Sequence, residues 1–267
     1  MRWTNGSQSL TGSIVVLPDR GKRGDFGARS TRRLPSISVG HTNSFGQPIG
    51  DDLGRWTAPS LPEHTDLLGT HVRLEPLQRS RHAIPIFHTF NQTSAEHWTY
   101  MPLGPFRDAA ELGQVIDAMN KAPDTFPYAV LVGNEVHGLL SYLRAQPDVG
   151  VIEIGWIIFS PQLQQTTATT ETIFLLLDRA FSTGYRRVEW KCDALNAASR
   201  ATAERLGFVY EGTFRQATHY KGRNRDTAWF AMTDHDWDLN GRRLRNWLSP
   251  VNFDDAGIQR QRLGDMA

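Results

Sequence analysis

The chain has 267 residues, of which 39% are hydrophobic, and its formal net charge is +1 at pH 7. A charge balance this close to neutral argues against nucleic acid or a membrane surface as a partner. The single cysteine, Cys192, excludes an intramolecular disulfide and a cysteine-based zinc site. No apolar run approaches the ~20 residues that span a bilayer, so we expect a soluble protein.

The first part of the chain differs in composition from the rest. It is rich in Arg, Gly and Ser and poor in acidic residues, and such a segment cannot bury enough apolar surface to offset its chain entropy. We therefore expect a disordered extension over residues 1–45, followed by an extended arm over 46–66. A basic, acid-poor composition resembles an organellar transit peptide, but the glycines break any amphipathic helix. A cytoplasmic protein is the expectation, and import directed by residues 1–40 is the less favoured alternative.

Strands and helices then alternate along the chain. Residues 70–77 predict a strand that Pro76 stops. Two amphipathic helices are expected at 81–90, with Ile84, Phe87 and His88 on its buried face, and at 109–119. Strands at 128–132 and 136–142 flank Gly133-Asn134, which is a strong hairpin signal.

The second half continues the alternation. Its expected elements are a strand at 151–159, a helix at 169–183, a strand at 187–192, a short helix after Asn196, an antiparallel pair at 208–215 and 227–232, and a helix at 234–247. A strand, a crossover helix and a second strand imply a parallel pair with a right-handed connection. We expect an α/β (α+β) fold with a mixed sheet of about seven strands and helices on both faces. It should form one domain over 67–248, with a flexible tail over 249–267.

The run Asn196-Ala197-Ala198-Ser199, followed later by Leu206-Gly207-Phe208, marks a capped helix. Asn196 accepts hydrogen bonds from the first turn, and Gly207 closes the helix in a left-handed conformation. This pattern resembles the last helix of the GNAT N-acetyltransferases, in the RimJ/RimL-like branch that modifies ribosomal-protein N-termini. An ordinary capped helix is the alternative.

The order of elements also resembles the GNAT fold, over roughly residues 67–240. The resemblance implies acetyl-CoA as co-substrate without a metal, and a parallel pair of strands that splays at the cofactor site. It further implies that Asn196 contacts the pantetheine amide, and that Ser199 hydrogen-bonds the coenzyme sulfur and helps to protonate it.

The family's pyrophosphate loop reads Gln/Arg-x-x-Gly-x-Gly/Ala, and here its positions hold Gln164-Gln165-Thr166-Thr167-Ala168-Thr169. Gln164 matches, whereas Thr167 and Thr169 stand where small residues are usual. β-Branched residues resist positive φ, so we expect ordinary helical geometry, with backbone N–H groups and the threonine hydroxyls of residues 166–170 donating to phosphate. A Thr-rich helix start without a ligand is the alternative.

The strand at 151–159 contains two unusual residues. Gly155 marks a bulge or a close backbone approach, and by resemblance a freed N–H of Ile154, Gly155 or Trp156 binds the thioester carbonyl and its oxyanion. Glu153 interrupts an otherwise apolar strand and is our candidate general base, acting through water. A structural Glu–Arg pair is an equally open interpretation.

The loop from Trp98 to Phe106 matches the Trp-x-Tyr-x-Pro-x-Gly-Pro-Phe pattern of the same branch. The resemblance implies that Trp98, Tyr100 and Phe106 line the acceptor pocket, and an aromatic loop packed on the core is the alternative. Five basic residues cluster near the closing hairpin, where a solvated surface is the default and the coenzyme 3′-phosphate or an acidic acceptor is the alternative. They are Arg215, His219, Lys221, Arg223 and Arg225.

We therefore expect an acyltransferase that moves an acetyl group from acetyl-CoA to a primary amine by direct attack in a ternary complex. The acceptor is a small-molecule amine or a protein N-terminal amine, and the protein is a monomer or homodimer without nucleic-acid or membrane partners. A non-catalytic acyl-CoA-binding protein of the same fold is the alternative. A nucleic-acid-associated role for the basic segments is disfavoured by the net charge.

Overall fold

The computed structural model describes residues 41–91 and 93–266. The expected extension over 1–45 therefore lies outside the described residues up to position 40, as does the import signal considered for residues 1–40. Among the described residues, no helix combines the length and apolar character needed to cross a membrane.

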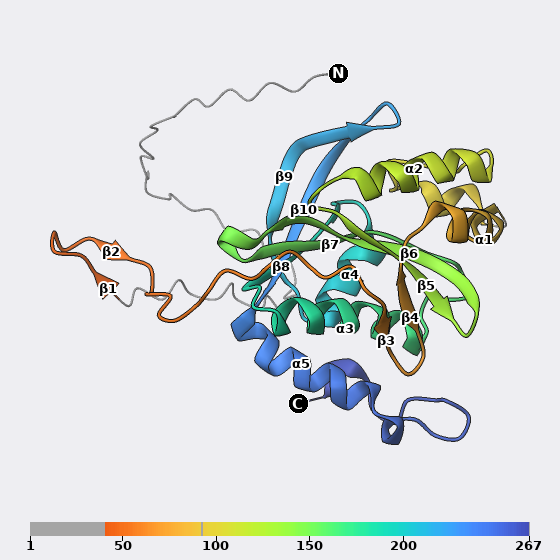
Figure 1. The fold of residues 1–267 in the computed structure, drawn as a ribbon. Coiled ribbons are helices and arrows are strands. Elements are labelled where there is room, and N and C mark those ends of the chain that lie inside the picture. The colour runs from red at the N-terminus through yellow and green to blue at the C-terminus, as the bar shows by residue number, and fades with distance from the viewer. Residues whose placement is uncertain (1–40, 92, 267) are drawn as a thin grey trace, which may run out of the picture. The chain divides into compact units, whose positions relative to one another are not determined.

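Eight strands form the main sheet, in the order β3-β4-β5-β6-β7-β8-β10-β9 (Figure 1). They are β3 (Leu67–Leu68), β4 (Arg73–Pro76), β5 (Phe126–Val132), β6 (Glu135–Gln146), β7 (Val151–Phe159), β8 (Arg187–Asp193), β9 (Val209–Tyr220) and β10 (Arg223–Thr233). Two short strands, β1 (His41–Thr42) and β2 (Pro48–Ile49), pair with each other upstream. The mixed sheet is confirmed, and its additional strand β3 is too short to leave a periodic pattern.

Helices cover both faces of this sheet, as expected (Figure 1). They are α1 (Arg79–Asn91), α2 (Ala109–Lys121), α3 (Thr167–Ser182), α4 (Ala197–Leu206) and α5 (Asp234–Leu248), with 3-10 turns η1 (Ala95–Trp98), η2 (Pro147–Val149), η3 (Pro250–Asn252) and η4 (Leu263–Asp265). Helices α1 and α2 share one buried apolar cluster with the sheet, and α3, α4 and α5 share a second cluster on the opposite face.

The buried face of α1 differs from the expected one. Ile84 is 61% exposed and His88 is also exposed, whereas His82 and Ile86 are buried. The face of α1 that packs on the sheet therefore includes His82, whose Nε2 lies 3.3 Å from a carboxylate oxygen of buried Glu75 in β4. A carboxylate buried beneath a helix is not visible in the helix's own periodicity.

The parallel pair at the centre of the sheet is short. Strands β7 and β8 pair from Val151–Arg187 to Glu153–Glu189, where the ladder ends, although both strands continue. Strand β7 bends away at a bulge against β6, where Trp156 has φ 52°. The bulge expected at Gly155 falls at the residues that follow it in β7, since Gly155 still pairs with Ser141 of β6. The two strands splay beyond Glu153.

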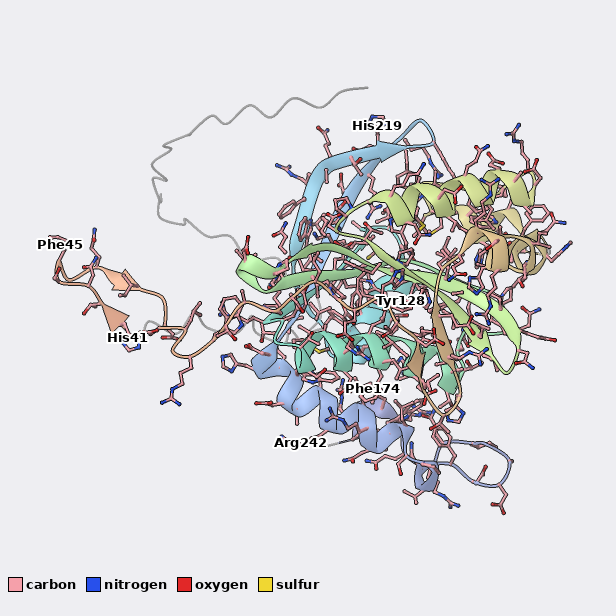
Figure 2. All side chains as sticks on the ribbon, viewed as in Figure 1. His41, Phe45, Tyr128, Phe174, His219 and Arg242 are labelled. Carbon is pink, nitrogen blue, oxygen red and sulfur yellow. The ribbon has the colours of Figure 1, made fainter. Side chains whose placement is uncertain are left out.

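Helices α3 and α5 pack side by side under the sheet. Figure 2 shows Phe174 of α3 next to α5, and its ring lies 6.0 Å from that of Trp237. Arg242 is exposed on the outer side of α5, and Leu244 is buried. Arg243 is also buried and donates to the Arg205 carbonyl at 3.2 Å.

The arm before the domain and the segment after α5 are both held by hydrogen bonds. In the arm, Trp56 donates its indole N–H to the Gly184 carbonyl at 3.0 Å. After α5, the Asn252 amide donates to the Trp247 carbonyl at 3.0 Å, and Leu263 is only 3% exposed within the core cluster. The segment expected to be a flexible tail over 249–267 therefore packs against the domain as far as η4.

Candidate active site

A cavity of about 1100 Å³ opens where β7 and β8 splay apart. Its walls come from these strands, the N-termini of α3 and α4, the loop after η1 and the β9–β10 hairpin. Of the predicted site residues, those that line it are Tyr100, Glu153, Ile154, Gly155, Trp156, Gln164, Gln165, Thr169, Asn196 and Ser199. The predicted residues Trp98, Phe106, Thr166, Thr167 and Ala168 lie outside this lining.

The N-terminus of α4 forms one wall. The Asn196 side chain accepts from the Ser199 backbone N–H at 3.1 Å, and Gly207 ends the helix at φ 105°, so both predicted caps are confirmed. The Ser199 hydroxyl oxygen accepts the Trp190 indole N–H at 3.0 Å. Because that bond fixes the oxygen and leaves the hydroxyl hydrogen able to donate, Ser199 can present a donor to a bound sulfur.

The N-terminus of α3 forms the wall predicted for phosphate. Thr166 caps the helix by accepting from the Thr169 N–H at 3.3 Å, and Thr167 onward is helical, as expected. The hydroxyls of Thr166 (at 2.7 Å) and Thr169 both donate to the Leu163 carbonyl, and buried Thr170 accepts from Arg205 at 2.9 Å.

These contacts correct the expected role of the threonine hydroxyls. The hydroxyl hydrogens of Thr166 and Thr169 are already donated to the Leu163 carbonyl, and the Thr170 side chain is buried. What the loop offers to an anion is therefore its backbone, with the N–H groups and dipole of the first turn of α3. Gln165, at φ 60°, provides the left-handed turn into the helix.

A buried ionic cluster lies on the face of β7 and β8 that points away from α3, α4 and α5. Glu153 is 4% exposed and is ion-paired with Arg144 and, at 3.1 Å, with the Lys191 ammonium. Lys191 also contacts Glu189 at 2.6 Å and lies 3.6 Å from the centre of the Trp229 ring. Side chains alternate along a strand, so Glu153 faces away from the core cluster that contains Ile152 and Ile154.

The cluster perturbs its own titration. Burial lowers the pKa of Lys191, and the neighbouring cations Arg144 and Arg187 add to this effect. Burial by itself raises the pKa of Glu189, but hydrogen bonds from Lys191 and Arg187 outweigh it, so the net pKa is lowered. Of these two groups Lys191 lines the cavity, and a group with a perturbed pKa at a cavity is typical of functional sites.

Sequence reasoning did not single out Arg144, Lys191 or Trp229. One signal was available on β8, where charged Arg187, Glu189 and Lys191 alternate with apolar residues; that alternation indicates a second, polar face. Arg144 had no such signal. Its place depends on a bulge in β6 where it adopts φ 47°.

The aromatic loop divides between the core and the cavity. Trp98 is 2% exposed, and its ring lies 5.6 Å from Phe90 and 5.5 Å from Phe106. Trp98 and Phe106 therefore belong to the core, as the alternative interpretation of this loop has it, and Tyr100 lines the cavity together with His97. Burial lowers the pKa of His97, which favours the neutral imidazole there.

The basic hairpin contacts this same loop. The Lys221 ammonium donates to the Trp98 carbonyl at 2.8 Å, and the Arg223 guanidinium donates to the Thr99 carbonyl at 2.9 Å. Both contacts lie near the turn of the long β9–β10 hairpin, where Figure 2 labels His219. The hairpin thus bridges to the η1 loop beside the cavity, and Lys221 and Arg223 are not simply solvated.

Comparisons with known proteins agree on one family. The family model described as the Acetyltransferase (GNAT) domain matches residues 71–209. A GCN5-related N-acetyltransferase from Brucella melitensis is 38% identical, with a TM-score of 0.76 over 79% of this chain and 98% of its own. A protein from Chromobacterium violaceum, described as a probable acetyltransferase of the GNAT family, is 40% identical, with a TM-score of 0.69 over 72% of this chain and 98% of its own.

More distant structures share the fold alone. The acetyltransferase from Salmonella typhimurium that modifies the N-terminal serine of the 50S ribosomal subunit protein L7/L12 is 22% identical, with a TM-score of 0.55 over 62% of this chain and 96% of its own. A search of curated protein sequences finds no match. The family model covers more than half of the chain, and the two nearer structures exceed 30% identity over more than two thirds of it. The chain belongs to the GNAT acetyltransferase family.

Proposed function

We propose that this protein is an acetyl-CoA-dependent N-acetyltransferase that acts on a primary amine by direct attack in a ternary complex. Acetyl transfer from acetyl-CoA follows from the family. The observation that carries the rest is the splay of β7 from β8, which puts a free backbone edge between the N-termini of two helices and beside a buried ionic cluster.

The coenzyme would lie along the α3–α4 side of the cavity. Its pyrophosphate fits the first turn of α3, where unpaired N–H groups and the helix dipole attract anions. Its pantetheine arm fits the edge of β7 from Ile154 to Trp156, which β8 no longer covers. Its sulfur then comes within reach of the Ser199 hydroxyl, with Asn196 beside it on the cavity wall.

The transfer balances without a further reactant. The amine lone pair attacks the thioester carbonyl carbon, the C–S bond breaks, and the amide N–C bond remains, so that an amine and a thioester become an amide and a thiol. A β7 N–H donor to the oxyanion is worth about 3–4 kcal/mol of barrier. The proton lost from nitrogen passes to Glu153 through water, and the leaving thiolate is protonated with the help of the Ser199 hydroxyl, which donates a hydrogen bond to the sulfur.

The ion pairs of Glu153 bear on this role in two ways. Arg144 and Lys191 favour its ionised form, which is the form that accepts a proton. The same cations weaken it as a base, so the proton must move on quickly to solvent. A non-catalytic acyl-CoA-binding protein is the second candidate, because an ion pair of this kind also serves a purely structural purpose.

The acceptor is an amine on a small molecule or a protein N-terminus, and we propose a RimJ/RimL-like enzyme. The match of the loop from Trp98 to Phe106 supports this branch, as does the position of Tyr100 on the cavity wall. The Salmonella enzyme supports the fold of the branch and says nothing about the substrate of this chain.

One experiment separates the two candidates. Purified protein is incubated with acetyl-CoA and a panel of amines, free thiol is followed continuously, and the products are identified by mass. We expect thiol release that depends on an acceptor and an acceptor heavier by one acetyl group. Tight acetyl-CoA binding in calorimetry without acceptor-dependent thiol release would instead support the non-catalytic protein.

A further inference from the structure

The acceptor side of the cavity has an imbalance of charge. Its lining includes three cations, Arg144, Lys191 and Arg225, and two carboxylates, Glu153 and Asp193. Both carboxylates are already engaged. Glu153 is paired with two of the cations, and Asp193 accepts the Tyr220 hydroxyl at 2.7 Å and the Leu195 N–H at 2.9 Å.

Arg225 is the cation left over. Within residues 41–91 and 93–266 it has no carboxylate within ion-pair distance, and its buried Nε has no hydrogen-bond partner. Its guanidinium carbon lies 5.9 Å from the centre of the Tyr220 ring. A buried guanidinium nitrogen without an acceptor is costly unless a water molecule or a ligand supplies one.

Arg144 faces the same space. Its side chain is 50% exposed although one end is ion-paired with Glu153, so its fork of donors has capacity to spare. Burial lowers the pKa of Arg144, and the nearby charge of Arg225 lowers it further. Arg144 and Arg225 line one cavity, and an anion bound between their guanidinium groups would reduce the repulsion of these two like charges.

Strand β10 supplies a third donor. Arg225, Thr227 and Trp229 alternate along the strand and line the same cavity. In the part of the chain that the structure describes, the Trp229 indole N–H is buried and has no acceptor. The acceptor wall therefore carries unsatisfied donors and lacks a matching acceptor group.

We propose that the amine acceptor carries a carboxylate or phosphate a few bonds from its amine, and that Arg225 and Arg144 bind this anion. The short spacing follows from Arg144, which reaches from the anion site to Glu153, the proposed base. This inference rests on the proposed N-acetyltransferase function and narrows its substrate to amino acids, amino phosphates or peptides that begin with an acidic residue.

The test uses pairs of acceptors that share an amine and differ in charge. The first pair is β-alanine and β-alaninamide, and the second is a tripeptide amide beginning with Asp and its counterpart beginning with Asn. Phosphoethanolamine and ethanolamine form the third. We expect the anionic member of at least one pair to have the higher kcat/KM, by about 10- to 100-fold, as hydrogen bonds to charged groups provide. The pair that responds distinguishes a free carboxylate, a peptide and a phosphate.

Two variants assign the effect to a residue. Arg225→Gln should lower the anionic-to-neutral ratio of kcat/KM by about tenfold. Arg215→Gln removes the same charge from an exposed position on the same hairpin, outside the cavity lining, and should leave the ratio within about twofold. Retained acetyl-CoA affinity in both variants shows that they are folded.

The outcomes separate this inference from the proposed function. Acetylation of the neutral members as efficiently as the anionic ones would overturn the inference and leave the function standing. An equal effect of both Arg variants would overturn the role of Arg225. If no amine is acetylated, the function fails, and calorimetric titration of both members of all three pairs into the protein with coenzyme A still decides the anion site. Equal binding of the two members within every pair would then reject it.

Discussion

The two sides of the cavity are built in different ways. On the proposed coenzyme side, the contacts that cap the two helices join residues close in sequence, such as Asn196 with Ser199 and Thr166 with Thr169. On the acceptor side, the contacts join distant residues of adjacent strands, such as Arg144 with Glu153 and Glu153 with Lys191. The first side relies on helix caps, and the second on charges balanced across the sheet.

This difference indicates that the two binding functions can be altered separately. Helix caps present backbone groups whose geometry depends little on the rest of the protein. A charge cluster depends on every member, because removing one leaves another buried and unpaired. Substitutions on the coenzyme side should therefore change affinity for acetyl-CoA, and those on the acceptor side should change turnover and acceptor choice.

The largest effect is expected from Glu153→Gln. Loss of the base should lower kcat by about 10²- to 10⁴-fold near neutral pH, while calorimetric affinity for acetyl-CoA stays unchanged. The pH profile of kcat should also differ between the wild type and the variant, because only the wild type has this carboxylate to accept the proton. A uniform loss with an unaltered pH profile would assign Glu153 to a structural ion pair, and Glu189→Gln, which also breaks a contact of Lys191, is the matched control.

The next largest effect should come from Thr167→Glu, on the opposite side. A carboxylate in the first turn of α3 would repel the pyrophosphate and weaken acetyl-CoA binding by about 100-fold in calorimetry. The fold should survive, because an acidic side chain at a helix N-terminus is favourable. Thr167→Gln has the same length without the charge and should lose far less, so equal losses would mean that shape and not charge excludes the coenzyme.

Ser199→Ala acts at the boundary between the two sides. Removal of the hydroxyl should reduce kcat by roughly tenfold through the lost donor to the thiolate. It also leaves the buried Trp190 N–H without its acceptor, which costs about 1–3 kcal/mol of stability in chemical denaturation. Ser199→Thr keeps the hydroxyl and should recover most of both losses. A turnover unchanged in the Ala variant would remove Ser199 from thiolate protonation.

The smallest effect is expected on the pH dependence of stability, from His82, a buried histidine outside the lining of the cavity. Burial lowers the pKa of His82, against an opposing effect of Glu75, and its Nδ1 accepts the Gln78 N–H at 3.0 Å. The unfolded chain thus binds a proton that the folded chain resists, so stability is lost as the pH falls below about 6.5.

We expect the Tm to fall between about pH 7.5 and about pH 5.5, and to fall less in His82→Gln. His88→Gln, at an exposed position of the same helix, should keep the wild-type pH dependence. Identical pH dependence in all three proteins would show that other groups, such as His64 or His97, whose pKa values burial also lowers, dominate the acid response.

The sequence alone determined most of the helices and strands and some of the residues that cap or turn them. The Gly133-Asn134 hairpin, the cap at Asn196 and the close at Gly207 could all be predicted, because each depends on residues within a few positions of one another. The parallel pair also followed from the order of strand, helix and strand. The residues of the Asn-x-x-Ser motif, Asn196 and Ser199, line the cavity.

Tertiary structure decided the rest. The bulge of β7 at Trp156 and the pairing of Glu153 with Lys191 depend on how neighbouring strands are aligned. The burial of Trp98 and the contact of His82 with Glu75 depend on how helices and loops pack on the sheet, although the contacting residues are near one another in sequence. Strand register and packing determine which side chains meet there, and neither is encoded by local periodicity. The helix caps on the proposed coenzyme side could therefore be predicted from the sequence, because they depend on local hydrogen bonds. The ionic cluster on the proposed acceptor side could not, because it depends on how the strands are aligned.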